Sequence, residues 1–167
     1  LLLRQSGLVW LPDTTTLALE SPFDFAKQGE LYIPPLTASP KQPEAHTEAV
    51  AEWLPKLIAA DEAVGTLVLF TSRKQMNEVA MRLPEEYLPL LLIQGEIPKS
   101  ALLEKHAKAL AEGRASIIFG LDSFAEGLDL PGEACVHVII VKLPFSMPDN
   151  PIEKTQNRWI EKRGGNP

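Results

Sequence analysis

The chain has 167 residues, of which 45% are hydrophobic and 23% charged, and its formal net charge is −6. This length is enough for one domain with a hydrophobic core and is short for two. An acidic chain lacks the broad basic surface that binds nucleic acid, so any such contact must be local or shared with another part of the protein. No apolar run reaches the roughly 18 residues that span a bilayer, and the start does not resemble a signal peptide. We therefore expect no membrane partner.

A single cysteine, Cys135, lies in the apolar run 135–141. One cysteine excludes an internal disulfide and a metal cluster built from cysteines, and its surroundings predict a buried structural thiol. This usage fits the reducing cytoplasm. The histidines His46, His106 and His137 are too scattered for a metal site, so we expect no metal ligands and structural or solvated histidines.

The first segment, residues 1–36, is expected to enter from a preceding motor domain and to carry one weak edge strand at 30–33, stopped by two prolines. Because the chain starts within an apolar run, we expect it to begin inside a larger protein. Residues 37–167 are expected to form one α/β domain.

Short apolar runs alternate with helical periodicity through this domain, which is typical of a parallel sheet with helices. Helices are expected at 44–60, where Pro55 is awkward, from a Ser72–Gln75 capping box to before Pro84, at 98–112 and from Pro151. A short helix is expected after the third strand. The expected strands are nearly continuous in hydrophobicity, as in strands covered on both faces, and lie at 66–70, 89–93, 115–119 and 136–141. Right-handed crossovers would give an open, doubly wound, mostly parallel sheet with helices on both faces.

Ligands of such a sheet collect at the carboxyl ends of its strands. Thr71 and Ser72 follow the first strand, Gln94 and Gly95 the second, and the loop 120–129 the third. Hydroxyls, an amide, glycines and helix-terminal N–H groups suit phosphate oxygens without reading the identity of a base.

The segment 120–132, Gly-Leu-Asp-Ser-Phe-Ala-Glu-Gly-Leu-Asp-Leu-Pro-Gly, closely resembles motif V of the DinG family of ATP-dependent DNA helicases, in the XPD-like branch of superfamily 2. Residues 138–145 are similar to the strand and Leu-Pro-Phe turn after that motif, and 66–72 resemble motif IV. Residues 21–25 resemble the link between the two motor domains, and 92–95 also have a counterpart. The resemblance covers nearly the whole chain and implies the second RecA-like motor domain of a P-loop NTPase-type helicase.

The resemblance implies partners for eight residues. The residues expected at the backbone of single-stranded DNA are Thr71, Ser72, Gln94, Gly95 and Ser123. The residues expected at the ATP cleft are Glu126, Gly127 and Asp129, with Asp129 bonding a ribose hydroxyl. Simpler roles stay open for these residues. Ser72 could be only a helix cap, Gln94–Gly95 could form only a turn, and the loop with Glu126, Gly127 and Asp129 could be a solvated acidic loop. Lys142 is either a DNA contact or a surface charge.

The chain contains no G-x-x-x-x-G-K-[ST] sequence, so the phosphate cradle and the Mg²⁺ ligands would belong to the other motor domain of the same protein. Motif VI, with its Gln and Gly-Arg, would lie beyond Pro167, and the domain would be truncated before it. Any iron–sulphur cluster would also lie outside this chain. We therefore expect no catalytic residue here and no ATP hydrolysis by the chain alone.

The sequence leaves two alternatives to a helicase motor domain. Within the family, the parent protein could be a DinG-related nuclease whose motor-like part does not unwind DNA. Outside it, a flavodoxin-like or receiver-like binding module would share the strand–helix alternation. Such a module would need a Gly-rich turn after the first strand or aspartates at the strand ends, and residues 71–73 offer neither.

Overall fold

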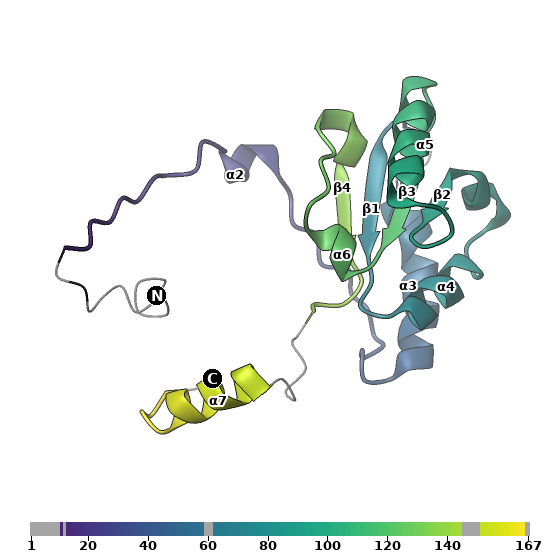
Figure 1. The fold of residues 1–167 in the computed structure, drawn as a ribbon. Coiled ribbons are helices and arrows are strands. Elements are labelled where there is room, and N and C mark those ends of the chain that lie inside the picture. Colours follow the sequence, from purple (N-terminus) through teal and green to yellow (C-terminus); the bar gives the residue numbers. More distant parts are fainter. Residues whose placement is uncertain (1–10, 12, 59–61, 145–150, 166–167) are drawn as a thin grey trace. The chain divides into compact units, whose positions relative to one another are not determined.

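The computed structural model describes residues 11, 13–58, 62–144 and 151–165 (Figure 1). The chain divides into two compact units, Leu1–Pro34 and Pro35–Pro167. The first unit contains the short helix α2, Phe25–Gln28. Residues 30–33 form no strand, so the expected edge strand is wrong. Leu31 and Ile33 are exposed rather than packed on a sheet, and the prolines that follow lack the N–H groups that strand pairing needs.

Four parallel strands form the sheet of the second unit, in the order β2-β3-β1-β4. They are β1 (Gly65–Leu69), β2 (Leu91–Ile93), β3 (Ser116–Gly120) and β4 (His137–Ile140). Leu69 pairs with both Gly120 and Ile140, and Ile93 pairs with Phe119. All four strands therefore end at one edge of the sheet. We call this edge the carboxyl rim and define it as residues 70–73, 94–96, 121–124 and 141–142.

Helices cover both faces of the sheet, which confirms the expected α/β architecture (Figure 1). One face carries α3 (Pro43–Leu57) and α4 (Arg73–Ala80), and the other carries α5 (Lys99–Ala111) and α6 (Asp122–Ala125). The core on the first face includes Leu54, Met76, Val79, Val68 and Phe119. The core on the second face includes Leu102, Phe124, Leu67 and Ile118.

The strand order explains why the helices separate onto two faces. The connection from β1 to β2 runs along the sheet in the opposite direction to the connections from β2 to β3 and from β3 to β4. Right-handed crossovers then place α4 on one face and α5 and α6 on the other. The loops leaving the neighbouring strands β1 and β3 therefore turn to opposite faces. This is the kind of point at which open α/β sheets bind ligands.

Several bounds differ from those expected. Pro89 and Leu90 belong to the 3-10 helix η2, Glu85–Leu90, so β2 has only three residues. Helix α3 continues through Pro55 for two residues and ends at Leu57. The expected end of that helix, Ala60, lies outside the described residues. A second 3-10 helix, η3 (Gly132–Cys135), precedes β4, and α7 spans Pro151–Glu161. No described helix combines the length and apolar character that crossing a bilayer requires.

The last strand was expected to be covered on both faces, and that expectation is wrong. β4 is one of the two edge strands of the sheet, and its side chains alternate between half-buried and exposed. Val138 and Ile140 are 56% and 52% exposed, because the helices of that face pack over the central strands β1 and β3. A hydrophobic run alone does not distinguish an edge strand from a central one.

His106 has a structural role, as expected. His106 is 1% exposed, and its Nε2 lies 2.8 Å from the carbonyl oxygen of Ala134 while its Nδ1 lies 2.8 Å from Ser116 Oγ. Because a carbonyl only accepts, Nε2 carries the proton and Nδ1 accepts from the Ser116 hydroxyl. His106 thus ties α5 to β3 and η3. Cys135 is half-buried rather than fully buried, and burial raises the pKa of its thiol.

Candidate nucleic-acid interface

The carboxyl rim starts as a continuation of the sheet. Backbone hydrogen bonds pass beyond the strand ends, from Phe70 N to Gly120 O at 2.8 Å and from Gln94 N to Phe119 O at 2.9 Å. A third runs from Val141 N to Leu69 O at 3.0 Å. The loops that carry the predicted DNA-contacting residues therefore leave the sheet from adjacent points on a rigid base.

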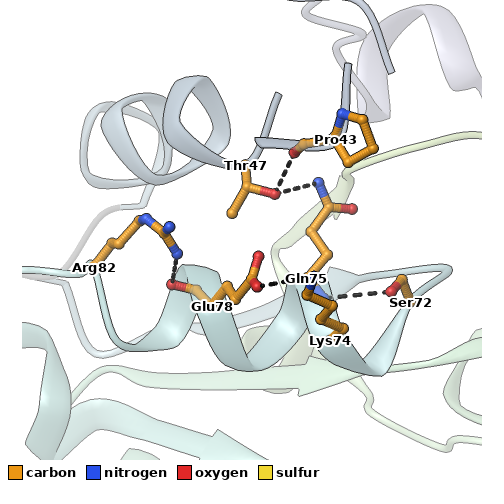
Figure 2. Close-up of polar contacts among 7 residues, drawn as sticks. All are labelled: Pro43, Thr47, Ser72, Lys74, Gln75, Glu78 and Arg82. Carbon is orange, nitrogen blue, oxygen red and sulfur yellow. Dashed lines mark hydrogen bonds and ion pairs between the residues drawn. The ribbon is translucent and has the colours of Figure 1, made fainter. Parts of the chain in front are cut away.

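Ser72 caps the helix that leaves β1. Its Oγ accepts a hydrogen bond from the backbone N–H of Gln75 at 3.3 Å, as the capping-box pattern predicts (Figure 2). The other half of the box is wrong, since the Gln75 side chain does not return to Ser72. Its Nε2 instead lies 3.3 Å from Thr47 Oγ1 and 2.9 Å from His46 Nδ1, both on α3. The cap is thus linked to α3, and Thr71 beside it is exposed.

A cavity of about 210 Å³ lies beside this cap. Thr71, Ser72, His46 and Lys142 are among its lining residues. Burial first, and the charge of Lys142 second, lower the pKa of His46, so the ring is neutral near pH 7. Two cations and two carboxylates line the cavity, and one such pair, Lys74 and Glu78, lies 3.7 Å apart (Figure 2). The charges that line the cavity balance. Thr47 Oγ1 is already bonded to Pro43 and Gln75, so the hydroxyls of Thr71 and Ser72 are the ones with a hydrogen to donate to a phosphate oxygen.

Gln94 joins the loops that follow β2 and β3. Its Oε1 accepts from the backbone N–H of Leu121 at 2.6 Å, and its Nε2 donates to Ser123 Oγ at 2.7 Å. Its backbone carbonyl accepts from Nη1 of Arg73 at 3.1 Å, which brings in the loop after β1. The structure therefore brings Gln94 and Ser123 together as predicted, but the Gln94 amide faces a protein loop.

Glycine is favoured at position 95 by the backbone conformation, and the guanidinium group of Arg73 lies close beside it. The Gly95 φ of +100° is in the region that side chains disfavour, and an added Cβ would lie 2.7 Å from Arg73 Nη1. The space beside this glycine is thus occupied by a guanidinium group. A phosphate that approached Gly95 would meet Arg73 as well.

The loop after β3 is also fixed from α5. Lys99 Nζ donates to the carbonyl oxygen of Gly127 at 3.2 Å and lies 5.5 Å from the centre of the Phe124 ring. Gly127 has a φ of +70°, which favours glycine there. Glu126 and Asp129 are exposed. Among the described residues no hydrogen bond or ion pair joins Asp129 to the rim, so its predicted place in an ATP cleft stays a prediction.

Two basic residues of the site were missed from the sequence, Arg73 and Lys99. Each is the first residue of its helix, where a positive charge opposes the helix dipole. Each instead donates to a carbonyl group of a neighbouring loop. A cation in the first turn of a helix that follows a strand was the signal that could have identified them.

Acidic and metal-binding side chains do not cluster at the rim. In the part of the chain that the structure describes, no group of three or more His, Cys, Asp or Glu residues could hold a metal ion. The site offers hydroxyls, amides, glycine backbone and two basic side chains. These groups suit phosphate oxygens and sugar hydroxyls.

Comparison with known proteins decides the family. Residues 56–167 match the model of the helicase C-terminal domain. The chain belongs to this family. Over 171 aligned residues this helicase C-terminal domain is 41% identical to the ATP-dependent DNA helicase DinG of Photobacterium profundum, covering 98% of the chain and 24% of that protein. It is 35% identical over 160 residues to the ATP-dependent DNA helicase DinG of Escherichia coli, covering 95% and 22%.

These relatives confirm the resemblance to the DinG family and exclude the flavodoxin-like alternative for this helicase C-terminal domain. The chain spans about a quarter of the length of the curated relatives it matches. The activity and partners of the whole protein are therefore matters of proposal.

Proposed function

We propose that this domain is the second motor lobe of an ATP-dependent DNA helicase, where it supplies part of the single-stranded DNA track and one wall of the ATP cleft. The observation that carries the proposal is the carboxyl rim, where the loops after β1, β2 and β3 are joined through Gln94 and Arg73. In a helicase-family domain, such a rim at a topological switch point is the natural place for the ligand.

The DNA backbone would lie along the rim. The hydroxyls of Thr71, Ser72 and Ser123 and the backbone at Gly95 would contact phosphate oxygens, and Arg73 would add a positive charge. A few contacts of this kind are enough for tracking that ignores base sequence, and they agree with a net charge of −6. The wider basic channel would then come from the other motor domain.

The ATP cleft would use the exposed segment after α6. Asp129 would accept a hydrogen bond from a ribose hydroxyl, with Glu126 and Gly127 beside it. Hydrolysis also needs a phosphate cradle, Mg²⁺ and an arginine at the transferring phosphoryl group, which other parts of the protein would supply. We infer that the chain alone does not hydrolyse ATP, and that any iron–sulphur cluster lies elsewhere, because Cys135 is the only cysteine in the sequence.

The domain limits and the location of the protein belong to the same proposal. Residues 1–36 would lead in from the first motor domain and residues 37–167 would form the second, a division supported by the boundary between Pro34 and Pro35. We place the protein in the cytoplasm with DNA. Because both relatives described above are named helicases, we favour a helicase over a DinG-related nuclease as the parent protein.

Substitutions in the full-length protein separate the two proposed surfaces. Ser123→Ala should raise the concentration of single-stranded DNA that half-saturates ATP hydrolysis about ten-fold, with little change in the KM for ATP, because one hydrogen bond to a charged group is lost. Asp129→Ala should raise the KM for ATP about as much and weaken unwinding, with little change in DNA affinity.

Matched controls are Ser100→Ala and Glu133→Ala, which remove an exposed hydroxyl and an exposed carboxylate outside the proposed surfaces. Both controls should behave as the wild type. Wild-type unwinding by Asp129→Ala, or exchange of the two effects between Ser123 and Asp129, would contradict the proposal.

A further inference from the structure

The orientation of the Gln94 amide is fixed by the backbone. An amide side chain can be turned by 180° without a change of shape, so its orientation has to be established from its partners. The N–H of Leu121 can only donate, and it lies 2.6 Å from one end of the amide. That end must be the oxygen Oε1. The other end, which lies 2.7 Å from Ser123 Oγ, must be the donor Nε2.

This orientation determines what the Ser123 hydroxyl can do. A serine hydroxyl has one hydrogen to donate and two lone pairs that accept. Nε2 of Gln94 has only hydrogens to offer, so Ser123 Oγ accepts in this contact and its own hydrogen is not used. No other hydrogen bond of Ser123 Oγ is found among the described residues, and the side chain is exposed. The hydroxyl hydrogen is therefore available to an acceptor from outside the domain.

Gln94 itself is held firmly enough to orient its neighbour. Its backbone N–H donates to Phe119 O at 2.9 Å, its carbonyl accepts from Arg73 at 3.1 Å, and its side chain is half-buried. Because Gln94 Nε2 is held in place, the Ser123 hydroxyl hydrogen points away from it before the ligand binds. Preorganisation of this kind lowers the cost of binding.

We propose that Gln94 is a positioning residue, which orients the Ser123 hydroxyl so that it donates to a phosphate oxygen of single-stranded DNA, and that the Gln94 amide does not bind the DNA itself. This inference rests on the proposed function, since it assumes that Ser123 contacts DNA. It reassigns Gln94, which the family resemblance places directly at the DNA backbone.

A double-mutant cycle in the full-length protein tests the inference. Gln94→Met keeps the length of the side chain and removes both amide bonds. It should raise the half-saturating concentration of single-stranded DNA several-fold, leave the rate at saturating DNA and the KM for ATP unchanged, and have no further effect when Ser123→Ala is already present. If Gln94→Met prevents folding, Gln94→Glu replaces it. A carboxylate can still accept from Leu121, but it cannot donate to Ser123, and its added charge cancels in the cycle because it is present with and without Ser123.

The matched control is Gln75→Met. The Gln75 amide binds Thr47 (Figure 2) and also His46, and it does not bind Ser123. The effect of Gln75→Met on DNA affinity should add to that of Ser123→Ala. Equal effects of Gln94→Met with and without Ser123, or no effect with Ser123 present, would overturn the inference while the DNA track stands. Unchanged DNA affinity in Ser123→Ala alone would instead overturn the assumed contact and the inference with it.

Discussion

Single residues at the rim and in the core have fixed hydrogen-bonding roles, because a backbone group determines each of them. Leu121 N–H sets the orientation of Gln94, and the Ala134 carbonyl sets the tautomer of His106. Thr47 donates to the Pro43 carbonyl at 2.7 Å, so its oxygen accepts from Gln75 (Figure 2). Buried polar groups arranged in this way hold one geometry and are costly to leave unpaired.

His106 should make stability depend on pH. Burial lowers its pKa in the folded chain, despite the opposing hydrogen bond to Ala134, while the unfolded chain keeps a value near 6.5. Below about pH 6.5 the unfolded state therefore binds a proton that the folded state resists, and stability falls as the pH drops. His46 acts in the same direction.

Urea unfolding of the chain at pH 7.5 and pH 5.5 measures this effect. His106→Gln removes the titrating ring and can still donate to the Ala134 carbonyl. It should lower the free energy of unfolding at pH 7.5 by roughly 1–2 kcal/mol and reduce the further loss at pH 5.5. If His106→Gln left the difference in the free energy of unfolding between pH 7.5 and pH 5.5 unchanged, His106 would not be the source of the pH dependence.

Some of these residue roles could be predicted from the sequence and others could not. The Ser72 cap depends on a partner three residues away, so the local pattern was sufficient. Gln75 and Gln94 bind partners 27–29 residues away, which only the folded sheet brings close. Local spacing therefore assigned Gln75 to the wrong partner and left the orientation of Gln94 undetermined.

Helix starts are the elements that build the interface. α4 begins at the end of β1 with Ser72 as its cap, and α5 begins with Lys99, which reaches the loop after β3. The N-terminus of α4 therefore lies at the rim, where free N–H groups can hold oxygen ligands.

Two substitutions can separate the role of Ser72 as the cap of α4 from its proposed contact with DNA. Ser72→Ala should lower the free energy of unfolding by about 1 kcal/mol, because the cap is lost. Ser72→Asp should keep the cap and most of that stability, because aspartate is a good N-cap. In the full-length protein, however, Ser72→Asp should weaken single-stranded DNA binding through charge repulsion. Thermal unfolding and DNA titration of both variants test this, and normal DNA binding by Ser72→Asp would leave Ser72 as a cap alone.

Element type was predictable from hydrophobic pattern, but exposure was not. The four strands and the helices between them were found near their expected positions, because continuous apolar runs indicate buried strands and a 3.6-residue repeat indicates helices. The exposed face of β4 depends on which strand lies at the edge, and η2 replaced the first two residues of the expected second strand. Both outcomes depend on tertiary arrangement.

In the domain as a whole, topology gathers the residues of the proposed DNA track at one edge of the sheet. The loops after β1 and β3 separate at the switch point, and Gln94 and Arg73 join them to the loop after β2. The expected convergence of Ser72 and Ser123 at one rim follows from the parallel register. Asp129 lies on the segment that leaves the rim toward η3, whose far end returns to Gly65 at the start of β1. This course of the chain away from the hydroxyls proposed to contact DNA suits a separate surface for ATP.

The most direct test is amide hydrogen exchange of the full-length protein with and without a single-stranded oligonucleotide. If the rim holds the DNA backbone, exchange should slow together in residues 71–75, 94–97 and 121–124 and stay unchanged along η2 on the remote part of the domain. Protection elsewhere in the domain, with these three loops unchanged, would contradict the account.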